Sequence, residues 1–257
     1  MQFKIKYLLL YGVGLLIGLP IIFLVVLSLS TTWVFPIVLP KGITVTHWVG
    51  LFKGNSNIQL GFIYSLGIAL IVAFIAVIIG FFLAKFVMYN KYSKLLINII
   101  YCPFVLSPVI FAVCIRYYFL NLHLVGNLVG VIIAQLLVAV PYSILFFTSF
   151  FNAKVKAYYQ LVSTLGGSSF IAFKNIILPL AKSFIQLCFF QCFLLSWFEF
   201  GLTTIIGYGK IKTLTINVFQ YISEANIFEA ALSCCVLILP PIVLLWINKK
   251  VALKQTH

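Results

Sequence analysis

Acidic side chains are almost absent from this chain: its 257 residues include three Asp or Glu residues, against 17 Lys and Arg residues. All three are glutamates, Glu199, Glu224 and Glu229. Charged residues make up 8% of the sequence and hydrophobic residues 64%, which leaves too few polar groups to cover the surface of a soluble domain. The composition therefore excludes an ordinary water-soluble protein and predicts an integral membrane protein that is covered largely by lipid.

Motifs for catalysis and metal binding are missing as well. The sequence has no HExxH, no GxSxG and no Gly-rich phosphate loop followed by Lys-Ser/Thr, so we expect neither an enzyme nor ATP hydrolysis by this chain. The cysteines lie inside apolar runs and lack the CxxC and His spacing of a metal site, so packing roles are favoured and no metal or cofactor is expected. They are Cys102, Cys114, Cys188, Cys192, Cys234 and Cys235.

The net charge of +14 raises the question of nucleic acid, because clustered basic residues neutralise phosphates. The lysines instead stand at the ends of apolar runs and do not follow one face with interleaved polar groups. Membrane topology explains this arrangement better, and no nucleic-acid partner is expected.

Long apolar runs predict an all-α membrane domain over residues 1–257. The first run has 23 residues, which at about 1.5 Å each cover a hydrocarbon core of about 30 Å. It is too long for a cleaved signal peptide and is followed by no cleavage site. The third run contains Pro103 and Pro108, which predict a kink. The expected spans are 8–30, 60–88, 96–119, 124–150, 181–206 and 227–247.

The distribution of basic residues predicts the topology. If both termini are cytoplasmic, twelve of the 17 Lys and Arg residues lie on the inner side, in agreement with the positive-inside rule. Segments 31–59 and 207–226 are then external, and the second is expected to be helical over 214–223. The segment 152–180 is then cytoplasmic.

Residues 158–179 predict two short amphipathic helices separated by glycines. Gly166 and Gly167 can end the first helix in the left-handed conformation. Ser168 or Ser169 can cap the second, whose apolar stripe is Phe170, Phe173 and Ile177. Pro179 suits the first turn of the next helix.

The sequence of this loop resembles the coupling loop of ABC importer permeases of the type I, MetI-like class. That loop usually reads Glu-Ala-Ala, three residues, Gly, nine residues, Ile, one residue, Leu-Pro. The glycine, isoleucine, leucine and proline fall at Gly166, Ile176, Leu178 and Pro179. The Glu-Ala-Ala positions fall on Gln160, Leu161 and Val162, so the acidic residue that the family uses is missing.

Two further segments look like permeases of the group that includes polyamine, iron, thiamine and phosphonate importers. They are residues 33–40, Trp-Val-Phe-Pro-Ile-Val-Leu-Pro, and residues 196–203, Ser-Trp-Phe-Glu-Phe-Gly-Leu-Thr. The resemblance covers essentially the whole chain with one permease core.

The resemblance implies a fold, a function and a set of partners. The fold would have about six transmembrane helices and a cytoplasmic coupling helix, and the chain would form half of the translocation pore in a bacterial inner membrane. Two copies of a separate ATPase would bind ATP and Mg, and an extracytoplasmic binding protein would deliver the solute. A second permease would complete the pore; it could be a copy of this chain, but the polyamine-type resemblance favours a different chain. The residues expected to couple to the ATPase are Gln160, Leu165, Gly166, Gly167, Ser168, Phe170, Phe173, Ile176, Leu178 and Pro179.

Glu199 is the strongest candidate for a functional residue inside the membrane, because an ionisable group at that depth usually faces a cavity or a partner. We hypothesise that it lines the translocation path, with Gln186, Gln191 and Ser196, and favours a cationic or zwitterionic solute such as a polyamine. The alternative is an interfacial glutamate, or one neutralised by the partner permease. Glu224 and Glu229 are expected to be solvated, or to dock a binding protein.

Two other classes of function stay open. A secondary transporter would usually show internal repeats and several intramembrane charges, and neither is found here. A structural subunit of another membrane complex is compatible with the composition. The sequence leaves the solute unidentified.

Overall fold

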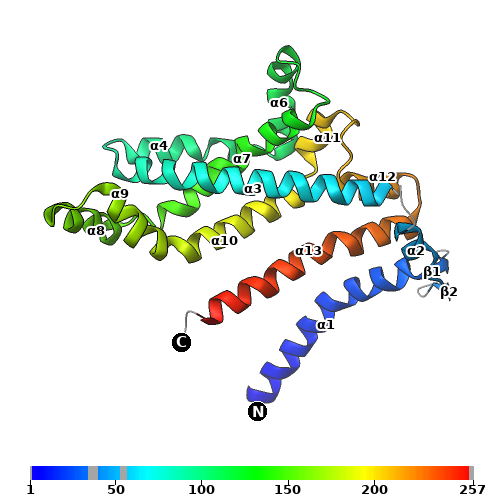
Figure 1. The fold of residues 1–257 in the computed structure, drawn as a ribbon. Helices are drawn as coiled ribbons and strands as arrows, with labels where there is room; N and C mark the ends of the chain where they lie inside the picture. The colour runs from blue at the N-terminus through cyan, green and yellow to red at the C-terminus, as the bar shows by residue number, and fades with distance from the viewer. Residues whose placement is uncertain (1, 34–39, 53–56, 255–257) are drawn as a thin grey trace. The chain divides into compact units, whose positions relative to one another are not determined.

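Helices account for most of the chain in the computed structural model, which describes residues 2–33, 40–52 and 57–254 (Figure 1). Most of the Trp33–Pro40 motif, together with Lys53, lies outside the described residues. The chain forms two compact units. The first comprises Met1–Ile63 and Thr213–Ile242, and the second comprises Tyr64–Lys212 and Val243–His257.

The first unit contains five helical segments and a small hairpin among its described residues. Its helices are α1 (Gln2–Ser28), α2 (Thr46–Phe52), the first turns of α3 (Asn57–Tyr89), α12 (Leu214–Ser223) and the first half of α13 (Ile227–Lys254). Strands β1 (Ser30–Thr32) and β2 (Lys41–Ile43) pair antiparallel, a hairpin that the sequence did not predict.

Hydrogen bonds join the end of α1 to this hairpin and to α2. Thr44 N–H donates to Leu29 O over 2.7 Å, which extends the pairing beyond the strands. Trp48 Nε1–H donates to Ser28 Oγ over 3.3 Å, so the side chain of α2 is held on the last turn of α1. These hydrogen bonds hold the hairpin and α2 against the end of α1.

The second unit is a bundle around α7. Its helices are the remainder of α3, α4 (Ser93–Ile100), α5 (Cys102–Val105), α6 (Pro108–Asn121), α7 (Leu128–Thr148), α8 (Ala153–Thr164), α9 (Ser169–Ala172), the π-helical turn η1 (Phe173–Ile177), α10 (Leu178–Trp197) and α11 (Gly201–Gly207). Helix α7 contacts α4, α5, α10 and α11, and α11 also packs on α6.

Small residues and phenylalanines form the core of this unit. A Cβ atom added to Gly80 of α3 would clash with Ser143 of α7, so the two backbones approach closely here. Next to this contact the Phe81 ring packs on Phe147 and Phe151, each at a centroid distance of 5.0 Å. Buried aromatic rings contribute large apolar areas and favour edge-to-face packing. This cluster fixes the end of α3 against the end of α7.

Four helices are long and apolar enough to cross a membrane among the described residues. They are Asn57–Tyr89, Leu128–Thr148, Ser169–Trp197 and Ile227–Ile247. Gly14–Ser28 and Pro108–Asn121 are shorter apolar helices. The described chain is thus mostly helical and has helices that could cross a membrane, in agreement with the expected fold class, with four candidate spans where the sequence predicted six.

The predicted span 96–119 is divided into three helices. Leu106 and Ser107 are extended, with ψ values of 148° and 150°, and they separate α5 from α6. The physical reason is Pro108, because a proline ring disfavours the helical conformation of the preceding residue. Ser107 then caps α6 by accepting a hydrogen bond from Ile110 N–H over 3.4 Å. The expected kink is therefore a complete break.

The predicted span 181–206 also ends early. Helix α10 stops at Trp197, and Glu199 and Phe200 lead into the separate short helix α11. The helix predicted over 214–223 is confirmed as α12.

Candidate functional site

The connection between α7 and α10 contains α8, a turn and α9, and we call residues 153–172 the α8–α9 loop. Helix α8 ends at Thr164 with Leu165 as its C-cap, and Gly166 has a φ of +75°. Gly166 N–H donates to Ser163 O over 3.1 Å, and Gly167 N–H donates to Val162 O over 2.9 Å. These bonds provide donors for carbonyl groups at the end of the helix. Glycine takes this left-handed conformation without the clash of a Cβ atom. The predicted helix stop is confirmed.

The second half of the loop starts as the sequence predicted. Ser168 Oγ accepts a hydrogen bond from Ile171 N–H over 3.3 Å and caps α9, so Ser168 and not Ser169 is the cap. Helix α9 continues through η1 into α10, where Leu178 N–H donates to Phe173 O. This wider turn directly precedes Pro179, whose ring would crowd the carbonyl four residues before it in a regular α-helix. Pro179 therefore lies near the start of α10 but within a continuous helical segment.

The α8–α9 loop exposes several apolar side chains. Leu165 is 79% exposed and Phe170 70% exposed, and Leu161 and Ile171 are exposed beside them. The loop is anchored by Val155 and Ala172, which are buried. An exposed apolar group of this size on a structured loop is typical of a contact surface.

The predicted coupling residues divide between the surface and the interior. Phe173 is half-buried and stacks on Phe82 at a centroid distance of 5.9 Å. Gly167 and Ile176 are also half-buried. The structure thus separates anchoring residues from exposed ones, a division that the sequence pattern did not give. The exposed ones are Gln160, Leu165, Gly166, Ser168, Phe170, Leu178 and Pro179.

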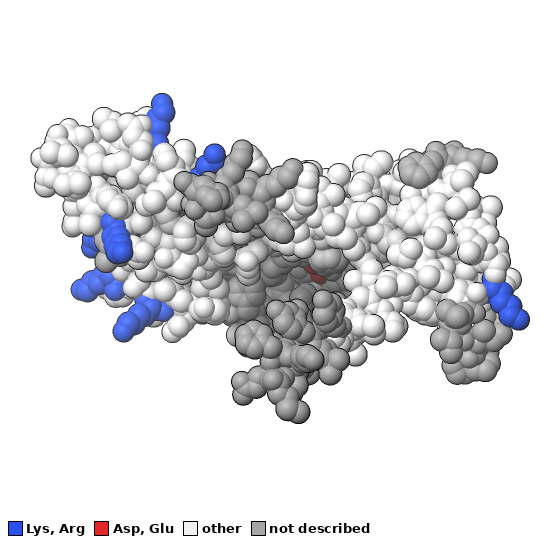
Figure 2. Space-filling model, turned by 90° about the horizontal axis from the view of Figure 1, so that it is seen from below, with Lys and Arg blue, Asp and Glu red and all other residues white. Residues whose placement is uncertain are grey.

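Lysines gather at the end of the second unit that carries α4, α8 and α9 (Figure 2). Two of them lie over aromatic rings: Lys85 Nζ is 4.1 Å from the Tyr159 ring centroid, and Lys156 Nζ is 5.9 Å from that of Tyr89. These contacts join α8 to the end of α3. Residues 64–198 include no Asp or Glu, so the surface is basic and apolar. Its lysines are Lys85, Lys91, Lys94, Lys154, Lys156, Lys174 and Lys182.

Glu199 is buried, with 8% of its surface exposed, and its carboxyl group caps α11. Oε1 accepts from Leu202 N–H over 2.6 Å, and Oε2 accepts from Thr203 N–H over 2.9 Å. Capping side chains satisfy N–H groups that have no partner within the helix, and a negative charge suits that end of the helix dipole. The early end of α10 follows from this arrangement, because the chain must turn for Glu199 to reach the next helix.

A chain of buried side chains extends from Glu199 to α7. Thr203 Oγ1 donates to Glu199 over 2.7 Å, and Gln135 Nε2 donates to Thr203 Oγ1 over 3.0 Å. Ser196 Oγ in turn donates to Gln135 Oε1. Sequence reasoning selected Glu199 and Ser196 but missed Gln135 and Thr203. A glutamine within an apolar run was the available signal for Gln135.

The two remaining candidates for the translocation path do not join this network. Gln191 Oε1 accepts a hydrogen bond from Tyr142 Oη over 2.6 Å, which links α10 to α7 at another level. Gln186 is half-buried on α10. The structure therefore brings together Glu199 and Ser196 and leaves the glutamines apart from them.

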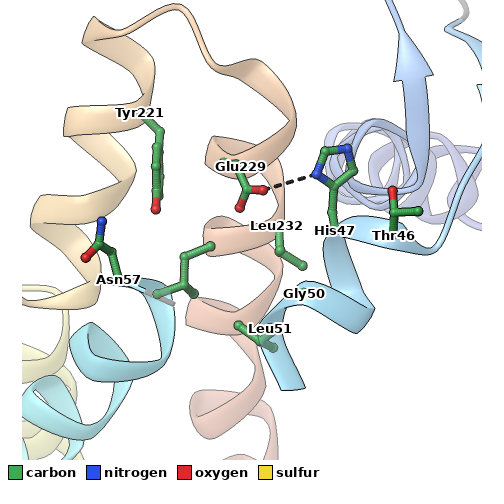
Figure 3. A pocket seen from close by; sticks show the side chains of 9 residues that line it. Thr46, His47, Gly50, Leu51, Asn57, Tyr221, Glu229 and Leu232 are labelled. Atoms are coloured by element: carbon green, nitrogen blue, oxygen red, sulfur yellow. Dashed lines mark hydrogen bonds and ion pairs between the residues drawn. The ribbon is translucent and has the colours of Figure 1, made fainter. Parts of the chain in front are cut away.

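A pocket of about 510 Å³ lies in the first unit, between α2, the start of α3, α12 and the start of α13 (Figure 3). His47 Nδ1 and Glu229 Oε1 are 3.1 Å apart across it, and the His47 ring stacks on Phe228 at 5.8 Å. Tyr221 and Asn57 lie on the other side of Glu229 (Figure 3). The side chains of Glu229 and His47 are 28% and 25% exposed, so Glu229, which was expected to be solvated or to dock a binding protein, is partly exposed and paired with His47.

The Tyr221 phenol in this pocket is held in its neutral form. Burial raises the pKa of Tyr221 above its ordinary value, and the charges of Glu229 and Glu224 raise it further. A hydrogen bond with Asn57 acts in the opposite direction. Glu229 was named from the sequence, but this pocket was not predicted, because His47 and Glu229 are 182 positions apart in the chain.

In the described part of the chain, no group of three or more His, Cys, Asp or Glu side chains converges. Comparison with protein-family models and with curated protein sequences finds no match to this chain.

Proposed function

We propose that the chain is the permease subunit of an ABC importer and that the α8–α9 loop couples it to a separate ATPase. The observation that carries this proposal is the loop itself. It is a structured, exposed, apolar segment that follows the candidate span α7 and leads into the Ser169–Trp197 candidate span, whose first four residues it includes, and its turn is set by Gly166 and Ser168. A loop that only connected two membrane helices would need neither two capped helices nor exposed Leu165 and Phe170 side chains.

The type I fold with six spans is part of this proposal. In it the shorter apolar helices Gly14–Ser28 and Pro108–Asn121 supply the two crossings beyond the four long helices. The termini and the lysine-rich end of the second unit then face the cytoplasm of a bacterial cell. Two ATPase copies bind ATP and Mg on that side, and a second, different permease and an extracytoplasmic binding protein complete the importer.

The contact with the ATPase in this proposal depends on apolar and basic groups. The position at which the family carries a glutamate is Gln160, which is exposed on α8. The surrounding lysines make this surface positively charged. In place of a salt bridge from a glutamate of the permease, these lysines pair with acidic groups of the ATPase. Exposed Phe170 and Leu165 supply the apolar part of the contact.

The translocation path in this proposal runs beside α10, with Glu199, Ser196, Gln186 and Gln191 as its polar residues. Glu199 acts there mainly as a positioning residue, because three donors of α11 already occupy its carboxyl oxygens. Glu199→Gln is expected to lower uptake through a misplaced α11. Uptake at the wild-type rate in the Glu199→Gln variant would show that Glu199 does not belong to the translocation path.

Co-purification tests the proposal. The tagged full chain, extracted in mild detergent from its native membrane, is expected to bring with it an ATPase and a second permease. Phe170→Asp and Gly166→Pro should abolish ATPase recovery, the first by placing a charge in the apolar contact and the second because proline cannot adopt φ of +75°. Leu122→Asp is the matched control, since Leu122 is equally apolar and exposed but lies at the end of α6.

The outcomes separate the competing functions. ATPase recovery that is lost in the two loop variants and kept in the control supports the permease. A chain that purifies alone, yet carries out ion-coupled uptake, would make it a secondary transporter. A chain that brings other membrane proteins but no ATPase would make it a structural subunit.

A further inference from the structure

The pocket of the first unit combines a carboxylate, a carboxamide, a phenol and an imidazole around one cavity of about 510 Å³. We propose that it binds a small organic amine, with the ammonium group on Glu229 and the hydrocarbon part on the apolar wall. Cavities of this volume with a few convergent polar groups are typical of small-molecule sites. All nine lining residues belong to the first unit, so the site is complete within it.

Glu229 supplies the charge that an ammonium group needs. Its Oε1 atom is held by His47 at 3.1 Å, which fixes the carboxyl group in place. Its Oε2 atom has no hydrogen-bond partner among the residues that the structure describes. No lysine or arginine lies among the nine described lining residues. Charge-assisted hydrogen bonds of this kind are about twice as strong as neutral ones.

Tyr221 and Asn57 complete the polar half of the site. Both lie beside Glu229 in Figure 3, on the side away from His47. The Tyr221 phenol is neutral, so it offers an oxygen and an aromatic ring instead of a second negative charge. A cation next to an aromatic ring gains a further attraction from the electron density of the ring face. A ligand with an ammonium group can therefore use three groups of the wall at once.

Apart from the Thr46 hydroxyl and the Gly50 backbone, the remaining wall is apolar and favours an amine with a hydrocarbon part over a metal ion. Leu51, Ile58 and Leu232 line it, and they offer contact area but no ligand atoms for a cation. Among the described lining residues, His47 and Glu229 are the two side chains of the kinds that bind metals, and a protein metal site usually has at least three such ligands. An ammonium with an aliphatic or aromatic tail satisfies both halves of the wall.

Isothermal titration on the purified full chain in lipid nanodiscs tests the site. The probe is phenethylamine, and phenethyl alcohol is its neutral analogue of the same shape. We expect the amine to bind at least about tenfold more tightly than the alcohol and Glu229→Gln to remove at least about tenfold of its affinity. Glu224→Gln is the matched control, because Glu224 is exposed, bonded to Gln220 and outside the wall. The affinity of the Glu224→Gln variant for phenethylamine should stay within about twofold of that of the wild type.

A second variant tests the location independently of the charge. Gly50 lines the pocket, and a Cβ atom added there meets nothing within 4 Å, so Gly50→Leu can fill space without a clash at its base. It should abolish amine binding while the thermal unfolding transition is kept. This variant decides the question if Glu229→Gln fails to fold.

Three results would overturn the proposal. They are equal affinity for the amine and the alcohol, unchanged binding in both Glu229→Gln and Gly50→Leu, or an equal loss in Glu224→Gln and Glu229→Gln, which would show a diffuse electrostatic effect. The titration uses this chain without an ATPase. A failure here is therefore distinct from a failure of the importer proposal.

Discussion

The Thr203 hydroxyl donates a hydrogen bond to Glu199 Oε2 over 2.7 Å, and the Thr203 N–H group donates to the same oxygen over 2.9 Å. Gln135 donates to that hydroxyl from α7. One carboxyl group therefore both caps α11 and ties it to the central helix of its unit. A buried donor or acceptor that loses its partner carries the full penalty of desolvation, so this network is sensitive to small changes.

Removal of the Glu199 carboxyl group should destabilise the protein. Glu199→Ala leaves the N–H groups of Leu202 and Thr203 without their acceptor in a buried place, and we expect a loss of roughly 1–3 kcal/mol in the free energy of unfolding. Denaturant unfolding in detergent, followed by the helical circular dichroism signal, measures it. Glu224→Ala should change the value by less than about 0.5 kcal/mol, because Glu224 is exposed. Equal values for the two variants would contradict the capping role.

Gly80 should tolerate no larger residue. A Cβ atom at Gly80 clashes with Ser143, and overpacking of such a contact costs roughly 1–3 kcal/mol, so Gly80→Ala is expected to lower the unfolding midpoint. Gly67→Ala on the same helix is the control. A Cβ atom at Gly67 meets nothing within 4 Å, and alanine favours a helix by about 0.5–1 kcal/mol over glycine. A midpoint for Gly80→Ala at or above that of Gly67→Ala would show that α3 and α7 are farther apart.

The backbone conformation of Gly166 alone should determine which residues can replace it. No atom lies within 4 Å of an added Cβ, so the penalty of Gly166→Ala is the left-handed conformation, roughly 1–2 kcal/mol. Gly166→Asn should lose less, because asparagine tolerates this conformation. Hydrogen exchange of the Gly167 amide, which bonds to Val162 O, is the local readout. It should be fastest in the alanine variant, intermediate in the asparagine variant and slowest in wild type, and no difference would contradict the observed turn.

Tyr221 should contribute to a loss of stability at alkaline pH. The pKa of Tyr221 is raised in the folded protein above its ordinary value of about 10, mainly by burial, so the folded state binds the phenolic proton more tightly than the unfolded state. This contribution is fully present below about pH 10 and is lost as the pH rises through the folded pKa. Tyr221→Phe should therefore show a smaller drop in unfolding midpoint from pH 9 to 11, whereas Tyr92→Phe, at an exposed position, should follow wild type.

The local parts of this structure could be predicted from the sequence. The turn at Gly166 and the cap at Ser168 depend on residues within a few positions of each other, and α12 is bounded by an exposed loop on each side. The broken span before Pro108 was predicted only as a kink. Whether a helix bends or stops there depends on whether Ser107 finds an N–H group to cap, which a hydropathy pattern does not contain.

The relations between distant residues could not be predicted. The helices of the membrane region are apolar on all sides, so their sequences do not say which face meets protein and which meets lipid. The contact of Gly80 with Ser143 and the pairing of His47 with Glu229 both depend on how separate helices pack. Glu199 was recognised as unusual, but its partners were not, because they come from α7 and from the next helix.

The most direct measurement of the central claim is the side of the membrane on which the α8–α9 loop lies. A single cysteine is introduced as Leu165→Cys in a chain whose six native cysteines are replaced, and intact cells are treated with a membrane-impermeant maleimide. Leu122→Cys serves as the counterpart at the other end of the same unit. The account predicts that Cys at 165 is labelled only after the cells are permeabilised, and that Cys at 122 is labelled from outside. Labelling at 165 in intact cells, or no labelling in either condition, would contradict it.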